Sequence, residues 1–278
     1  MALRYAIRIK AGFLLALALA LALTIVVPSV VQAKGIPNTI GQGFEFFSGK
    51  YGTTARTDTM YAPFAVSVNP TERLNLSLEI PFIYQNNGNI VSGISINKSQ
   101  NATTASAVTS SSTSANQEEN GLGDIILRAG YTLVPDTDST PQVHPTVFIK
   151  FPTADKNKSL GTGEYDEGFA VEISKWLGKW YSSVEAGYTV QGRSSQFALR
   201  NYLTYNAGIG YRISNDIFTS FLISGTSPPG DGTGSILEAQ LKMQYQLTQH
   251  AALIGSAVKG ISTYSPDYGT GLVICYSF

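Results

Sequence analysis

Few side chains in this sequence could carry covalent or metal chemistry. The 278 residues include two histidines, His144 and His250, and a single cysteine, Cys275. The histidines fall in separate connecting segments, so their spacing places neither of them in a Ser-His-Asp set. A lone thiol in a strand-like run is typical of a small packing residue. We therefore expect no enzymatic activity, no cofactor and no metal site.

Two short segments imitate ligand-binding loops without completing them. The stretch DTDSTPQ, which starts at Asp136, begins like a calcium loop, but Pro141 stands where that loop needs glycine and Val147 where it needs glutamate. The stretch GDGTGS at 230–235 lacks the lysine of a phosphate-binding loop. We interpret both segments as connections between structural elements.

The remaining polar chemistry lies in charged side chains, which are scarce. They make up 14% of the chain, against roughly 25% in ordinary soluble domains. Lys and Arg together number 19, as do Asp and Glu, so bulk charge does not favour a nucleic-acid partner. A chain with so little charge is poorly suited to covering a soluble surface.

The elements that must position these charges are strands, because apolar and polar residues alternate through most of the chain. In SILEAQLKMQYQL, the apolar residues occupy the odd positions from 237 to 247, with polar residues between them. RLNLSLEIPFIY, from Arg73, repeats this pattern. The alternation predicts twelve strands, over residues 43–51, 59–68, 73–85, 123–134, 143–153, 165–177, 180–191, 202–213, 217–226, 235–247, 251–262 and 267–278.

The connections between these strands alternate between short turns and longer loops. Together with an even strand count, this alternation is typical of outer-membrane barrels. We therefore predict an all-β fold, a single antiparallel up-and-down transmembrane β-barrel of about 12 strands, with both termini on the periplasmic side. The Ser/Thr-rich tract at 97–120 is predicted to be a disordered external loop. A solubilising spacer is favoured for it over a receptor or adhesin role.

The first 33 residues have the features of an export signal. Three basic residues precede an apolar run over 11–27, and Val31 and Ala33 supply the small residues of a cleavage site. We predict a signal peptide over 1–33, cleaved near Ala33, and an outer-membrane barrel domain over 34–278. The alternative is an uncleaved inner-membrane anchor. The expected partners are the lipid bilayer and the barrel-assembly machinery.

On the predicted strands the charged residues face away from the apolar side. An Arg or Lys that faced lipid at the midplane would cost about 2–4 kcal/mol, so we expect these side chains to face inward. They could line a wet pore, or they could form a salt-bridge network that fills the interior. The inward set, which we regard as lumen-lining candidates, comprises Glu45, Arg73, Glu79, Asp124, Arg128, Lys150, Glu172, Glu185, Arg212, Glu238 and Lys242.

Aromatic residues gather near the predicted strand ends and suggest girdles at the two membrane interfaces. These residues are Phe44, Phe46, Phe47, Tyr61, Tyr84, Trp176, Trp180, Tyr181, Tyr211, Tyr268, Tyr276 and Phe278. In the last strand, Ile274, Tyr276 and Phe278 share one face, which resembles the C-terminal assembly signal of outer-membrane barrels. We expect Cys275 to face the interior, on the opposite side of the same strand.

Several short motifs in the middle of the chain carry a family resemblance. They are GLGD at 121–124, a K-x-P-T strand end within 150–155, LGTG at 160–163 and GY at 187–188. The chain resembles the outer-membrane barrels of the MetA-pathway of phenol degradation group over roughly its central 75 residues. The resemblance implies a transporter-like barrel. Its motif glycines suit turns and strand kinks.

These observations support one functional hypothesis and one alternative. The hypothesis is an outer-membrane channel or transporter for the passive uptake of small solutes, with hydrophobic or aromatic compounds suggested only by the family label. Selectivity would come from pore width and rings of charge. The alternative is a structural or surface-display barrel whose lumen is plugged and which transports nothing.

Overall fold

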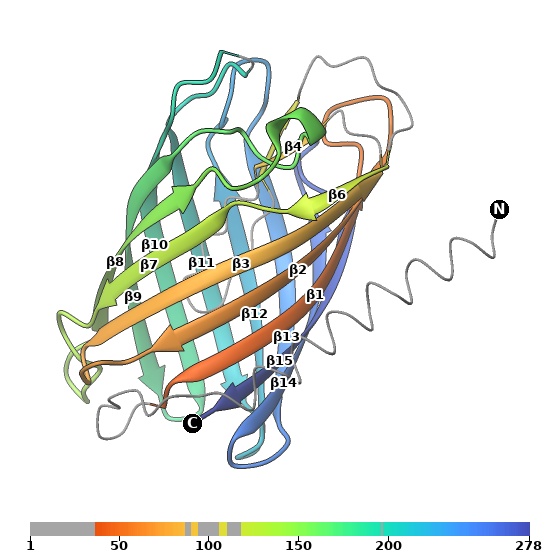
Figure 1. Ribbon diagram of the computed structural model, residues 1–278. Helices are drawn as coiled ribbons and strands as arrows, with labels where there is room; N and C mark the ends of the chain where they lie inside the picture. Colours follow the sequence, from red (N-terminus) through yellow and green to blue (C-terminus); the bar gives the residue numbers. More distant parts are fainter. Residues whose placement is uncertain (1–36, 87–89, 94–105, 110–117, 196) are drawn as a thin grey trace, which may run out of the picture.

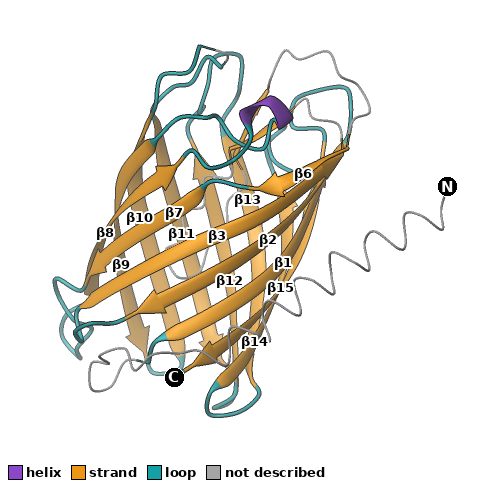
Figure 2. Ribbon diagram, in the orientation of Figure 1, coloured by secondary structure: helices purple, strands orange, loops and turns teal. Residues whose placement is uncertain are grey.

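The alternating strands close on themselves into one antiparallel barrel of strongly tilted strands (Figures 1 and 2). This computed structural model describes residues 37–86, 90–93, 106–109, 118–195 and 197–278. The first strand, β1 (Thr39–Gly49), pairs with β2 (Thr57–Val68) on one side and with β15 (Tyr268–Ser277) on the other. Because the first and last strands pair, the wall has no free edge.

The remaining strands follow in chain order around the wall. Each pairs with the next, and the ladder from β7 to β15 is antiparallel throughout. Their bounds are β3 (Leu74–Asn86), β6 (Glu118–Leu122), β7 (Ile125–Tyr131), β8 (Gln142–Phe151), β9 (Asp166–Leu177), β10 (Trp180–Gln191), β11 (Tyr202–Arg212), β12 (Ile217–Thr226), β13 (Ile236–Gln246) and β14 (Ala251–Gly260).

One predicted strand is divided in two by a β-bulge. Both β6 and β7 pair with β3, so together they fill one position in the wall and the barrel has twelve positions. Leu122 is paired with Phe82, and Ile126 is paired with Glu79. Between these two pairs, residues 123–125 lie opposite residues 80–81 of β3. The one extra residue makes this a β-bulge. The extra residue turns Asp124 toward the interior.

Two prolines explain where the ladder is irregular. Pro63 and Pro81 face each other across β2 and β3, and neither has an N–H group to give to its other neighbour. The bulge lies beside Pro81, where Gly123 N–H still donates to the Pro81 carbonyl at 2.8 Å. On the other side, Gln42 Nε2 donates to the Pro63 carbonyl at 3.1 Å. The barrel thus tolerates both prolines without exposing an unpaired carbonyl there.

The twelve predicted strands correspond to the twelve positions of the wall, with shifted ends. The largest shifts are at two strand starts: β6 begins at Glu118 and not at residue 123, and β1 begins at Thr39 and not at residue 43. Inside the tract predicted to be disordered, Ser106–Thr109 forms strand β5 and pairs with β4 (Ile90–Gly93), and β6 begins at Glu118. Backbone pairing thus extends into a polar tract whose composition predicted none. The rest of that tract and the predicted signal peptide lie outside the described residues.

The described part of the chain contains one short helical segment, the 3-10 turn η1 (Lys156–Lys158). Within those residues, no helix has the length and apolar character needed to cross a bilayer.

The seam between the last and first strands continues one residue past β15. Phe278 N–H donates to the Asn38 carbonyl at 2.9 Å, and Asn38 N–H donates to the Phe278 carbonyl at 3.1 Å. On β15, Ile274 and Tyr276 are about half exposed on the outer face. Phe278 therefore contributes two backbone hydrogen bonds to closure.

We expect deletion of Phe278 to reduce the yield of folded barrel. The deletion removes two seam hydrogen bonds, each worth about 0.5–1.5 kcal/mol. Heat-modifiable mobility on gels reports the folded fraction. Phe278→Ala keeps the backbone bonds, and its yield separates the contribution of the ring from that of the main chain. A normal yield from the deletion variant would refute this role for the terminus.

Candidate functional site

The two faces of the wall differ sharply in polarity. Large apolar side chains cover the outside and leave about half of their surface exposed. They include Leu127, Val147, Phe169, Val184, Leu203, Ile209, Phe221, Leu241, Leu272 and Ile274. Their neighbours on the same strands point inward and are mostly polar. Such a surface requires lipid around it, so the interior is the place where polar chemistry can occur.

The eleven charged residues predicted to face inward fall into three groups. Glu45, Glu79, Arg128, Lys150, Glu185 and Glu238 are buried. Asp124, Glu172 and Lys242 are partly buried. Arg73 and Arg212 are exposed at the end with short turns. Arg73 lies in the turn before β3 and not in the strand where it was expected.

Buried hydrogen bonds and an ion pair link the inward faces of neighbouring strands at mid-height. The Tyr61 hydroxyl on β2 donates to Glu79 Oε1 on β3. Arg128 Nη1 on β7 lies 3.4 Å from Glu79 Oε2. On the opposite side of the order, Asn206 Nδ2 donates to Glu185 Oε1 at 2.6 Å. These contacts run along the wall, from one strand to the next.

A second ionic cluster lies at the end of the barrel that carries the longer loops. Lys150 Nζ is 3.0 Å from Asp124 Oδ2 and 2.8 Å from Asp166 Oδ2, and it donates to Thr162 Oγ1 at 3.1 Å. The first aspartate reaches Lys150 from the bulge beside β7, and the second lies at the start of β9. All three charged side chains are at least nine-tenths buried. The lysine thus ties two strands to the loop that contains Thr162.

That loop, residues 152–165, folds into the mouth of the barrel. The Ala154 N–H donates to Asp124 Oδ1 at 3.0 Å, and Gln85 Nε2 donates to the Ser159 carbonyl at 3.1 Å. A Cβ at Gly161 would lie 2.9 Å from both carboxylate oxygens of Asp124, so only glycine allows this approach. The loop is therefore fastened to the inner wall at several points.

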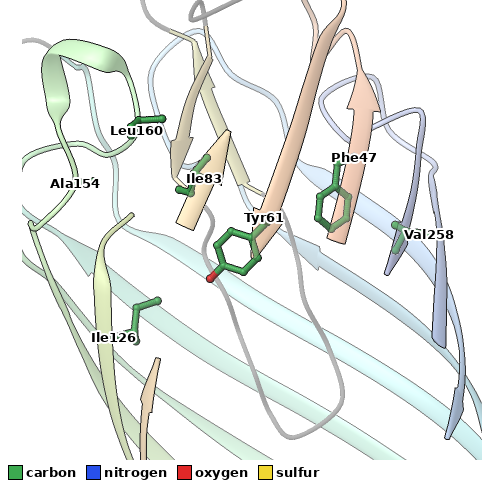
Figure 3. Close-up of a cluster of buried hydrophobic side chains, with 7 residues drawn as sticks. All are labelled: Phe47, Tyr61, Ile83, Ile126, Ala154, Leu160 and Val258. Atoms are coloured by element: carbon green, nitrogen blue, oxygen red, sulfur yellow. The ribbon is translucent and has the colours of Figure 1, made fainter. Parts of the chain in front are cut away.

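Folding of the loop completes an apolar cluster inside the barrel (Figure 3). Leu160 and Ala154 come from the loop, and the other members come from the wall. The cluster consists of Phe47, Tyr61, Ile83, Ile126, Ala154, Leu160 and Val258, with Phe148 packed against it.

 Ile126 stands one residue beyond the bulge, on the same inward face as Arg128. Along this strand, Ile126 therefore lies between Asp124 of the mouth cluster and Arg128 of the mid-height ion pair.

The prediction that the strand-end aromatic residues form girdles at the membrane interfaces is wrong for four of them. Phe47 and Tyr61 are buried in the interior cluster. Trp176 and Tyr181 share the inward faces of β9 and β10 with Ser174 and Glu185, whereas Trp180 is half exposed on the outside. Strand-end position alone does not distinguish the two faces, because one step along a strand reverses the direction of the side chain.

The inward aromatic residues form a second cluster, near the end with short turns. The Trp176 ring centroid lies 5.0 Å from that of Tyr181 and 5.6 Å from that of Phe218. The Arg212 guanidinium stacks over the Trp176 ring at 4.5 Å from its centroid, an attractive cation–π geometry. Arg212, which was predicted to face inward, therefore contacts an inward aromatic ring at the end of the barrel with short turns.

The adjoining turn is held in place by Asp136. Lys175 Nζ lies 2.9 Å from Asp136 Oδ1, and the Trp176 N–H donates to Asp136 Oδ2 at 3.1 Å. These two donors hold the pKa of Asp136 below its usual value, the Lys175 hydrogen bond contributing most. The segment that imitated the start of a calcium loop thus has a structural role, which is to bind the Trp176 N–H beyond Ser174, where the pairing of β9 with β8 ends.

Sequence reasoning identified the family motifs but not their convergence. Asp124 of GLGD, Lys150 of the K-x-P-T strand end and Thr162 of LGTG meet in the single ionic cluster at the mouth. The alternation predicted the inward direction of Asp124 and Lys150, but not the folding of the loop that brings Thr162 to Lys150. In the described part of the chain, no three His, Cys, Asp or Glu side chains are grouped so as to hold a metal ion.

Comparison with known protein families shows to which family this chain belongs. The family described as "Putative MetA-pathway of phenol degradation" matches residues 85–278, which include all the motifs of the mouth cluster. This chain belongs to that family. The MetA-pathway resemblance seen in the central motifs is therefore confirmed. A search of curated proteins found no match.

Solved structures show that the MetA-pathway chain has the fold of outer-membrane barrels. It is similar to the COG4313 outer membrane channel from Pseudomonas putida, with a TM-score of 0.61 at 15% identity over 91% of this chain and 100% of that one. It is also similar to the KdgM porin, with a TM-score of 0.54 at 10% identity over 86% and 99% of the two chains. The translocator domain of the autotransporter NalP from Neisseria meningitidis gives a TM-score of 0.50 at 10% identity over 89% and 91%.

We expect Lys150→Met to destabilise the barrel mouth. The change leaves Asp124 and Asp166 buried without their cation, and breaking a buried pair in this way costs about 3–5 kcal/mol. Denaturant unfolding of the folded barrel measures the loss. Lys158→Met, in the same loop but exposed, is the control and should leave stability within about 0.5 kcal/mol. Equal stability of the two variants would contradict a clamping role for Lys150.

Proposed function

We propose that this MetA-pathway barrel is an outer-membrane channel for the passive uptake of small solutes. The proposal rests on one observation, which is that the interior ion pairs run along the barrel wall and not across its axis. Glu79 with Arg128, and Lys150 with its two aspartates, join neighbouring positions of the wall. Pairs that follow the wall leave the axis of the barrel to solvent or solute, unlike pairs that cross it.

The similar structures support this proposal without deciding it. Two of them are an outer membrane channel and a porin crystallised with oligogalacturonate. The third is the translocator domain of an autotransporter, so the same fold serves more than one task. We further propose that residues 1–33 direct export and that the barrel-assembly machinery recognises the terminal strand with Ile274, Tyr276 and Phe278.

The composition of the interior favours solutes with an apolar or aromatic part. The apolar cluster around Leu160 lies toward the looped end, and the cluster of Trp176, Tyr181 and Phe218 lies toward the other. A solute that crossed the barrel would meet both. Apolar constrictions resist the passage of hydrated ions, whereas aromatic faces attract flat apolar groups.

A plugged structural barrel is the second candidate, and the same apolar cluster favours it. Leu160 is fully buried and closes part of the mouth from a loop. Planar-bilayer conductance and solute uptake by liposomes separate the candidates. A purified, folded barrel that neither conducts nor admits solutes would refute the channel and leave the structural role.

We expect Leu160→Ala to raise conductance. Truncation removes most of the side chain that the loop places in the cluster, at a packing cost of about 2–5 kcal/mol, and the loop should hold the mouth less tightly. Single-channel recording measures the change. Lys156→Ala, an exposed position in the same loop, should leave conductance unchanged. A lower or unaltered conductance in the Leu160 variant would show that the loop does not restrict the path.

We expect Trp176→Ala to weaken binding of aromatic solutes inside the barrel. Each lost ring contact is worth about 0.5–1.5 kcal/mol, which corresponds to roughly two- to tenfold in affinity. Block of ion current by benzyl alcohol measures this binding. Trp180→Ala is the matched control, because that ring lies four residues away on the outer face. Equal block in both variants would remove the inner aromatic cluster from the solute path.

A further inference from the structure

One buried carboxylate of the interior, that of Glu238, has no hydrogen-bond partner among the described residues. Glu238 on β13 is 1% exposed, and among the described residues neither of its carboxylate oxygens has a hydrogen-bond partner. By contrast, Glu79 pairs with Arg128, Asp166 with Lys150, and Glu185 accepts from Asn206. Burying a charge without a partner is costly, so this carboxyl group must either take up a proton or bind a cationic group.

By strand register, two other buried side-chain oxygens without partners lie on the same inward face near this carboxylate. Gln240 lies two residues along the same face of β13, and Thr226 lies diagonally opposite Glu238 on β12. Both are buried, and within the described part of the chain Gln240 Oε1 and Thr226 Oγ1 have no hydrogen-bond partner. The Pro266 carbonyl oxygen lies over Gly260, which is the partner of Glu238 on β14. The group therefore offers acceptors and needs a donor or a cation.

The surrounding charge has the sign that attracts a cation. The fully buried charged side chains of the described residues are the acids Glu45, Glu79, Asp166, Glu185 and Glu238, against the bases Arg128 and Lys150. Nearby, the Tyr51 hydroxyl lies in a loop outside the strands. Burial, followed by the negative charges of Glu238, Asp267 and Asp58, raises its pKa. Of these three acids, Asp267 is paired with Arg56, and the nearest base on the same face of β13 is Lys242, four residues from Glu238.

We propose that Glu238, Gln240 and Thr226 form a binding site for a small monovalent cationic group, either a metal ion such as Na⁺ or K⁺ or a primary ammonium. Oxygen ligands suit both, because a metal ion is bound by several oxygen atoms at once and a primary ammonium donates up to three hydrogen bonds to them. A single carboxylate balances one positive charge. Divalent ions usually take more carboxylates than one, which is why the monovalent class is favoured.

This site would give the proposed channel a preference for cations near its looped end. That consequence rests on the proposed function, because a barrel that does not conduct has no selectivity to display. Binding itself does not depend on conduction. The decisive experiment is therefore a stability measurement on the folded full-length mature chain, with ion selectivity as a second arm.

The probes are the chloride salts of sodium, potassium, methylammonium and tetramethylammonium at equal ionic strength. Tetramethylammonium has no N–H donor and is too large for a closed pocket, so it sets the baseline. A ligand at about five times its Kd should raise the thermal unfolding midpoint by about 2–4 °C. We expect that rise with methylammonium or with the metal ions, and the better probe identifies the source of the charge.

Variants assign the effect to the site. Glu238→Gln should abolish the difference between cations, and Thr226→Val should reduce it while keeping the shape of the side chain. Glu185→Gln, which alters a buried carboxylate that already has a partner, should retain it. Equal midpoints in all four salts for the unaltered protein would overturn the proposal. A difference that persisted in the Glu238 and Thr226 variants would do the same.

The second arm measures reversal potentials in a potassium chloride gradient. The unaltered channel should prefer cations, and Glu238→Gln should lose much of that preference. If the folded barrel does not conduct, the channel proposal fails while the thermal measurement still decides the site. If it conducts with the same selectivity in both forms, and the midpoints do not respond to cations, the site is refuted and the channel stands.

Discussion

The structure depends on the requirement that every backbone N–H and C=O group within a bilayer finds a partner inside the protein. Closure of β1 on β15 meets that requirement around the whole wall. The two prolines of β2 and β3 show how strict it is. Where Pro81 cannot donate, a bulge realigns the neighbouring strand, and where Pro63 breaks the ladder, the Gln42 amide supplies a donor. Irregularity is present only where another group compensates for it.

Closure also determines where charge can reside. With lipid outside, each strand must direct its polar residues inward, and neighbouring strands bring opposite charges within reach of each other. Glu79 and Arg128 pair in this way at mid-height, and Lys150 gathers two aspartates at the mouth. The same rule makes an unpaired residue conspicuous. Glu238 is held by the wall in a position where no neighbouring strand offers it a cation.

Alternation was sufficient to predict the twelve positions of the wall and the face occupied by Glu45, Lys150 and Glu238, because a period of two is a local property of the chain. The bulge at Asp124 was not predictable, since it depends on Pro81 in a strand that lies far away in sequence. Nor was the inward fold of 152–165, whose hydrogen bonds reach β3, β6, β7 and β8. Trp176 and Tyr181 were misplaced because strand-end aromatic residues occur on both faces. Contacts between distant segments, not local pattern, account for the bulge and for the fold of the loop.

The bulge between β6 and β7 has a consequence for how such sequences can change over evolutionary time. A one-residue insertion or deletion in a regular strand would turn every following side chain to the opposite face, and lipid would then meet Arg128. At the bulge an extra residue is already absorbed: Gly121 faces inward before it and Ile126 after it, although their numbers differ by an odd count. Length changes at this point can therefore be neutral when those elsewhere in the wall are not. At such a bulge, related sequences can gain or lose a residue while the side chains before and after it keep the same faces.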